Sequence, residues 1–287
     1  MGLTPLDFFT KARFEPIDAG LLLVGAAWYI WSLRRLAQKD RRWPAWRTAC
    51  FAGAWLLFAV VAFSGLSAFD RRNFTAYGSI YIALGLVAPA LLALSSPVTL
   101  ALLSGRDGAG ASWLEGRTAR ILGGPVTVWV LFSATVFLVF FAGVVGATVG
   151  GGPGPQLLHL WLLAAGWLYF WPVADVDPSP RRIGYLARIL YLLVTFPVFA
   201  IMGMGLESQT ARVAPGISPA SLHLGGAVVW VAGETVALAG VLWVFALWLR
   251  ADERRVRAQE RSNEQVAARQ LAVWRASREA AAEAASG

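Results

Sequence analysis

The chain's histidines and methionines are the residues whose types could bind a soft metal ion. Both histidines, His159 and His223, and two of the three methionines, Met202 and Met204, lie near the ends of apolar segments. Imidazole with thioether is a ligand set that suits Cu(I), because soft sulfur selects a soft ion. The alternative is that the histidines are interfacial polar residues and the methionines fill packing gaps.

Glu234 is the only carboxylate deep within an apolar segment. A carboxylate at membrane depth is costly, so it usually pairs with another group or serves a proton or ion path. The alternative is a protonated glutamate that is hydrogen-bonded to a neighbouring helix. Tyr77 and Tyr81, which have the i, i+4 spacing of one helix face, begin another apolar segment at the same predicted end as the histidines.

Several chemistries are excluded by the residues present. Lys11 and Lys39, the only lysines, lie outside the apolar segments, so a retinal Schiff base is excluded. The sequence contains no P-loop or GxGxxG motif in a strand–helix context, no HExxH and no GxSxG. We therefore expect that the protein is not an enzyme.

The composition predicts that these residues are positioned by membrane-spanning helices. Hydrophobic residues make up 57% of the chain and charged residues 15%, with a mean hydropathy of +0.57. About a quarter of the residues in a soluble domain are charged, so the chain has the composition of a membrane protein. The net charge of +8 comes from basic residues between apolar segments, which are topology signals and do not indicate nucleic-acid binding.

We predict an all-α, polytopic integral membrane protein with a seven-helix membrane domain over 19–249. A polar N-terminal segment, 1–18, precedes it, and a charged, cytoplasmic helical tail, 250–287, follows it. Pro89 and Pro97 predict a kink or break in the third span, for which a re-entrant pair is the alternative. The seven spans are expected at about 19–33, 48–69, 77–103, 125–149, 155–174, 184–206 and 224–249.

The basic residues also predict an orientation. Most of the 25 lysines and arginines follow the first, third and fifth spans or lie in the tail. The positive-inside rule then places the N-terminus outside and the C-terminus inside the bacterial cell membrane. This topology puts His159, His223, Met202 and Met204 on the outer face, where they could meet if the last three spans pack as neighbours.

Four stretches of the sequence resemble the CtaG family of membrane-embedded assembly factors for caa-type cytochrome c oxidase. They are RRWPAWRT, VAPALLALSSPVTL, HLWLLAAGWLYFWPVADVDPSPRR, and GGAVVWVAGE followed by WLRADER. The resemblance implies a metallochaperone-like role in the respiratory chain: helping to assemble or metallate the oxidase copper centre from the outer face.

Most of the histidines that this resemblance implies are replaced. A pair four residues apart corresponds to Tyr77 and Tyr81, and two further positions are Trp161 and Phe199, whereas His159 is retained. We therefore keep three hypotheses: an assembly factor with copper as a possible cofactor, a metal-free scaffold that docks on a respiratory complex, and a small transporter that uses Glu234. The expected partners are cytochrome c oxidase subunits or other respiratory membrane proteins and the lipid bilayer, with no nucleic acid.

Overall fold

The computed structural model describes residues 15–64, 73–105, 116–141, 153–208 and 218–286, and every regular element in these ranges is a helix. In chain order the elements are α2 (Pro16–Gln38), α3 (Ala45–Phe63), α5 (Phe74–Ile82), the π-helix η1 (Ala83–Val87), α6 (Ala88–Leu94), α7 (Pro97–Ser104), α9 (Arg117–Leu122), α10 (Pro125–Phe141), α12 (Gly154–Ala174), α13 (Tyr185–Leu193), α14 (Phe196–Ser208) and α15 (Pro219–Ser286).

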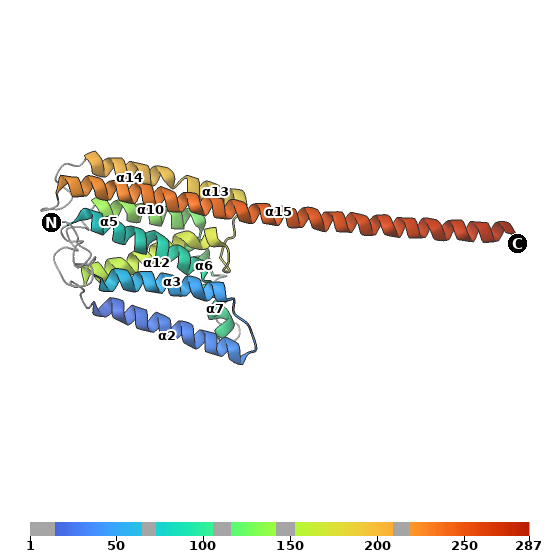
Figure 1. Cartoon of the computed structure of the whole chain (residues 1–287), viewed down its shortest axis with the longest axis horizontal. Coiled ribbons are helices and arrows are strands. Elements are labelled where there is room, and N and C mark those ends of the chain that lie inside the picture. The colour runs from blue at the N-terminus through green and yellow to red at the C-terminus, as the bar shows by residue number, and fades with distance from the viewer. Residues whose placement is uncertain (1–14, 65–72, 106–115, 142–152, 209–217, 287) are drawn as a thin grey trace. The chain divides into compact units, whose positions relative to one another are not determined.

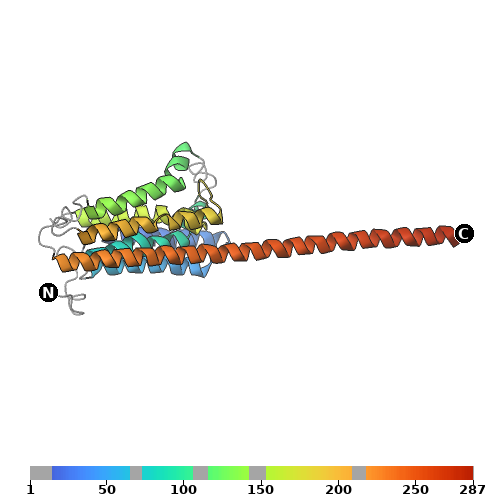
Figure 2. The same ribbon diagram turned by 90° about the horizontal axis from the view of Figure 1, so that it is seen from above.

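The chain divides into two compact units, Met1–Val241 and Leu242–Gly287. In the first unit the long helices run along a common direction in both views, as a bundle (Figures 1 and 2). The second unit contains the C-terminal part of α15, whose side chains are exposed over 252–272. There Arg257 donates a hydrogen bond to Glu253, one turn earlier, at 3.4 Å.

The prediction of an all-helical, polytopic membrane protein is confirmed over the described residues. Six helical stretches are long and apolar enough to cross a membrane, and they coincide with six of the seven predicted spans: Pro16–Gln38, Ala45–Phe63, Phe74–Leu94, Gly154–Ala174, Tyr185–Leu206 and Ala220–Ala272. The predicted span 125–149 corresponds to the shorter apolar helix α10, and its last part, 142–149, lies outside the described residues. The orientation of the N- and C-termini stays a prediction.

The third predicted span is shorter than expected, because a break divides it. The spanning stretch ends at Leu94, and Ser96 adopts a left-handed conformation with φ of 57° before Pro97 begins α7. The residue before a proline is sterically disfavoured from the α region, so the helix ends there. The other proline, Pro89, is tolerated within the span, directly after the widened π-helical turn of η1.

Helix α12 lies at the centre of the first unit, where it packs against α6, η1 and α10. A Cβ atom added at Gly166 would lie 2.3 Å from the Gly85 carbonyl oxygen and 2.6 Å from Pro89 Cγ. Only a glycine permits the backbones of α12 and η1 to approach so closely. This contact fixes the position of α12 and of the polar groups at its two ends.

Candidate functional site

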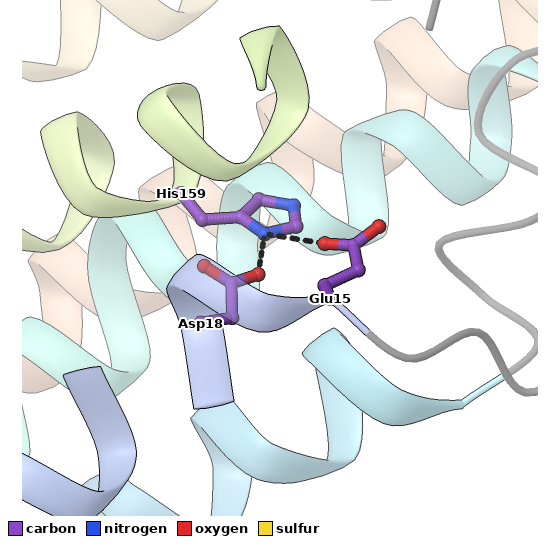
Figure 3. A group of neighbouring side chains, drawn as sticks. All are labelled: Glu15, Asp18 and His159. Atoms are coloured by element: carbon purple, nitrogen blue, oxygen red, sulfur yellow. Dashed lines mark hydrogen bonds and ion pairs between the residues drawn. The ribbon is translucent and has the colours of Figure 1, made fainter. Parts of the chain in front are cut away.

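A buried cluster of one imidazole and two carboxylates lies near the start of α12. His159 is 2% exposed, and its Nδ1 lies 2.8 Å from Asp18 Oδ2 and 3.9 Å from Glu15 Oε2 (Figure 3). One potential ligand atom from each of the three residues lies within 4.8 Å of the other two. Among the residues that the structure describes, this is the one such grouping of three or more histidine, cysteine, aspartate or glutamate side chains.

The start of α2 supplies both carboxylates. Pro16 begins the helix with a preset φ angle, Glu15 is the extended N-cap residue, and Asp18 lies in the first turn. Residues three apart share one side of a helix, and the positive end of the helix dipole favours carboxylates there. The backbone N–H of Ile17 also donates to Gln156 Oε1 on α12 at 3.2 Å. The two helix starts are therefore held together by this bond and by the His159–Asp18 contact.

A small cavity lies beside the imidazole. His159, Tyr77 and Tyr81 line it, together with Ile80, Pro155, Leu158 and Leu162. Its volume of about 10 Å³ leaves room for about one water molecule. The Tyr81 hydroxyl is buried and has no hydrogen-bond partner among the described residues. The two positions that the family resemblance assigns to a histidine pair thus line the same cavity as the retained histidine.

One carboxylate of the cluster is only partly satisfied. Asp18 has no exposed surface, and its Oδ1 has no hydrogen-bond partner among the described residues. Burying a polar atom without a partner is costly. A proton or a bound cation on this oxygen would supply the partner.

The four residues predicted to bind copper do not share one environment. Met202 has no exposed surface, whereas Met204 is 52% exposed and His223 is exposed on α15. Neither methionine lines the cavity beside His159, and the cluster that contains His159 does not include His223. Among the described residues, His159 therefore lies beside two carboxylates, and neither methionine lines its cavity; this oxygen-rich set does not fit a soft Cu(I) site. Metal binding by the predicted set stays a prediction.

Glu234 is hydrogen-bonded within its own helix. Its Oε1 accepts from Trp230 Nε1 at 2.6 Å, one turn earlier on α15, and the side chain is partly buried. This partner lies on the same helix, whereas one of the two alternatives from the sequence placed it on a neighbouring helix.

Two other positions implied by the family resemblance lie away from the cluster. Trp161 is 48% exposed, and its Nε1 donates to Thr135 Oγ1 at 3.2 Å. Phe199 is buried and packs edge-on against Phe132, with ring centroids 6.3 Å apart. Of the four replaced positions, only Tyr77 and Tyr81 are found beside His159.

Sequence reasoning missed Glu15 and Asp18, which it assigned to the polar N-terminal segment. Residues 1–14 of that segment lie outside the described residues, but Glu15 and Asp18 are buried. The pattern that could have identified them is a pair of carboxylates three residues apart at the start of an apolar helix. Such a pair places two acidic groups on one side of the helix, at its N-terminus.

A second pair of carboxylates, the buried Asp177 and the partly exposed Asp175, lies at the other end of α12. Asp177 is 1% exposed and accepts hydrogen bonds from the backbone N–H groups of Val98, at 3.0 Å, and Thr99, at 2.7 Å. Burial raises the pKa of the Asp177 carboxyl above its ordinary value of 3.8. A hydrogen bond from the Thr99 hydroxyl, the two backbone hydrogen bonds and the charge of Arg47 oppose the rise. Asp175 forms a hydrogen-bonded ion pair with the buried Arg188 of α13.

Comparisons with known proteins place these features in a family context. The model of the cytochrome c oxidase caa3 assembly factor family matches residues 27–251. The chain is 28% identical over 273 residues to an uncharacterized protein of Mycobacterium leprae, covering 86% of this chain and 41% of that protein. It is 29% identical over 277 residues to an uncharacterized protein of Mycobacterium tuberculosis, with coverage of 88% and 41%. The chain thus spans about two fifths of these relatives' length. No solved structure matches it.

Proposed function

Because the chain belongs to the cytochrome c oxidase caa3 assembly factor family, we propose that it helps to assemble a cytochrome c oxidase in the bacterial cell membrane. Its role is that of a non-enzymatic assembly protein, and its partners are oxidase subunits. The observation that supports a role beyond docking is the buried cluster at His159. The family resemblance of the sequence implies a histidine at this position, and it implies two more at Tyr77 and Tyr81, which line the same cavity.

The proposed place of action is the outer face of the membrane. The positive-inside distribution of arginine and lysine predicts that the starts of α2 and α12 lie on that side. Delivery of copper to the oxidase at this face would involve His159, because its imidazole is a nitrogen ligand suited to copper.

Complementation tests this function. A host strain that lacks the gene is given wild type, His159→Ala or Glu234→Gln, and assembled oxidase is measured from the haem spectrum and oxygen uptake of its membranes. We expect wild type and Glu234→Gln to restore the oxidase and His159→Ala to fail while accumulating in the membrane. Normal oxidase in the deletion strain would refute the proposal. Loss of oxidase with Glu234→Gln would instead favour the transporter hypothesis.

A metal-free docking scaffold is the second candidate. The observation that favours it is that Tyr77, Tyr81, Trp161 and Phe199 stand where the family resemblance implies histidines. A scaffold would work without the imidazole, so His159→Ala would restore the oxidase as well as wild type does. The tagged protein would also co-purify with oxidase subunits whether or not His159 is present.

A further inference from the structure

We propose that Glu15, Asp18 and His159 form a site for a divalent cation of borderline hardness, Zn(II) or Cu(II), in preference to Cu(I). The inference deepens the proposed function and rests on it, because it names the class of ion that the assembly factor would handle. Neither carboxylate lies within residues 27–251, which match the family model. Two of the three ligands thus lie outside the part of the chain that matches the family.

Charge is the first reason for a divalent ion. Asp18 is fully buried beside His159, and its Oδ1 has no hydrogen-bond partner among the described residues. A bound cation would give this oxygen a partner. Because Coulomb attraction is proportional to the charge of the ion, an ionised carboxylate attracts a divalent cation more strongly than it attracts Cu(I).

Ligand type is the second reason. The cluster offers one imidazole nitrogen and carboxylate oxygens, and it contains no cysteine. Imidazole suits zinc and copper, carboxylate oxygen suits harder ions, and thioether or thiolate sulfur is what selects Cu(I). A mixed nitrogen–oxygen set with two carboxylates therefore favours Zn(II) or Cu(II).

Distance is the third reason. Ligand atoms about 2.0–2.1 Å from a tetrahedral zinc ion lie roughly 3.3 Å apart. The observed separations from His159 Nδ1, 2.8 Å to Asp18 and 3.9 Å to Glu15, lie on either side of that value. Side-chain shifts of about half an ångström would bring both carboxylates to coordination distance, because the three groups already face one another (Figure 3). Three protein ligands also leave a position for an exchangeable ligand, which an ion in transit requires.

The neighbouring cavity completes the arrangement. When Nδ1 binds a metal, Nε2 carries the proton and requires an acceptor, which in metal sites is a carboxylate, a carbonyl or a water molecule. The cavity beside His159 has room for about one water molecule, and the unpartnered hydroxyl of Tyr81 lines it. Tyr81 would therefore orient His159 through water and thereby tune its affinity for the ion.

Metal titration of the full-length protein in lipid nanodiscs tests the site. Zn(II) and Cu(II) are each titrated in buffer, and Cu(I) is titrated under reducing conditions. We expect one Zn(II) or Cu(II) per chain and weaker binding of Cu(I). Asp18→Asn and Glu15→Gln, which keep side-chain shape, should each weaken divalent binding more than about tenfold, and Tyr81→Phe about tenfold. Glu234→Gln is the matched control and should bind as wild type does.

Cu(II) electron paramagnetic resonance gives a second measurement. The spectrum should show coupling to one imidazole nitrogen and lose it in His159→Gln. The inference is overturned if wild type binds neither divalent ion, or if Asp18→Asn and Glu15→Gln bind them as wild type does. A cluster that only holds a proton would give the first of these results. If Asp18→Asn fails to fold, Glu15→Gln at the N-cap provides the same comparison.

The outcomes for the site and for the function are separable. An assembly defect in His159→Ala without metal binding by wild type would refute the metal site and keep the assembly function. Tight divalent binding by wild type together with normal oxidase in the deletion strain would keep the site and refute the function.

Discussion

The two ends of α12 both bury carboxylates, but they treat them differently. At the end of the helix, Asp177 accepts hydrogen bonds from two backbone N–H groups, and Asp175 binds the Arg188 guanidinium. At the start, two carboxylates share one imidazole, and Asp18 Oδ1 has no hydrogen-bond partner among the described residues. Asp177 and Asp18 are both buried, so burial does not separate the two regions; the donors supplied to these two carboxylates do.

The difference in hydrogen bonding gives Asp177 a structural role and leaves Asp18 available for a chemical one. Asp177 satisfies N–H groups of the first turn of α7, which would otherwise lack acceptors after the left-handed Ser96. The sequence DVDPSPRR, among the most specific elements of the family resemblance, therefore connects α12 to α7 and α13. At the start of α12, Asp18 Oδ1 has no hydrogen-bond partner among the described residues, so it can still bind a ligand.

The largest expected effect comes from forcing α12 away from its neighbours, which should disturb both ends together. In Gly166→Ala the new Cβ would meet the Gly85 carbonyl at 2.3 Å, and backbone cannot move as a flexible side chain can. We expect a loss of about 3 kcal/mol in the free energy of unfolding. Thermal unfolding in detergent measures it, with Gly184→Ala as the control, because nothing lies within 4 Å of that position. Equal stability of the two variants would contradict the close contact.

The second-largest expected effect on stability comes from Asp177, beyond the C-terminal end of α12. Asp177→Ala removes the acceptor for Val98 and Thr99, so we expect a loss of about 2 kcal/mol in stability and faster hydrogen exchange at those two amides. Mass spectrometry of deuterium uptake locates the change in α7. Unchanged exchange there would show that Asp177 does not hold the helix start.

The third expected effect on stability comes from Asp18, beside the start of α12. In metal-free protein, Asp18→Asn removes a buried carboxylate that is only partly satisfied, so we expect a change of less than about 1 kcal/mol, of either sign. The same unfolding measurement as for Asp177→Ala provides the comparison. If Asp18→Asn destabilised the protein as much as Asp177→Ala does, the contrast between the two ends would not hold.

The smallest expected effect is a dependence of the protein's stability on pH. Burial raises the folded-state pKa of Asp177 above 3.8, so the folded protein binds this proton more tightly than the unfolded chain does. Stability should therefore fall as pH rises from about 3.8 through the folded pKa of Asp177, and then become constant with respect to this group. The melting temperature of wild type relative to Asp177→Asn isolates this contribution. A relative melting temperature that rises with pH would show that the hydrogen bonds outweigh burial.

The sequence by itself determined that the chain is helical and roughly where six spanning stretches lie. Apolar length predicted these stretches, because helix backbone bonds are local and hydropathy can be counted along the chain. Pro89 and Pro97 predicted a kink or break in the third span, but its expected end at 103 was wrong, since the stretch ends at Leu94. The sequence also identified His159 and the pair Tyr77 and Tyr81 as positions of interest. The last part of the predicted span at 125–149 could not be compared, because residues 142–149 lie outside the described ranges.

Only the tertiary structure decided which polar residues meet. His159 contacts Asp18, which lies 141 residues earlier in the chain, and shares a cavity with Tyr81 on another helix. No periodicity encodes this meeting, because helix adjacency depends on packing across the whole bundle, including the close contact at Gly166. For the same reason, the histidine–methionine set predicted from shared position at one membrane face did not include the carboxylates that surround the imidazole. The sequence shows at which level of the bundle each residue lies, whereas packing determines which residue it faces.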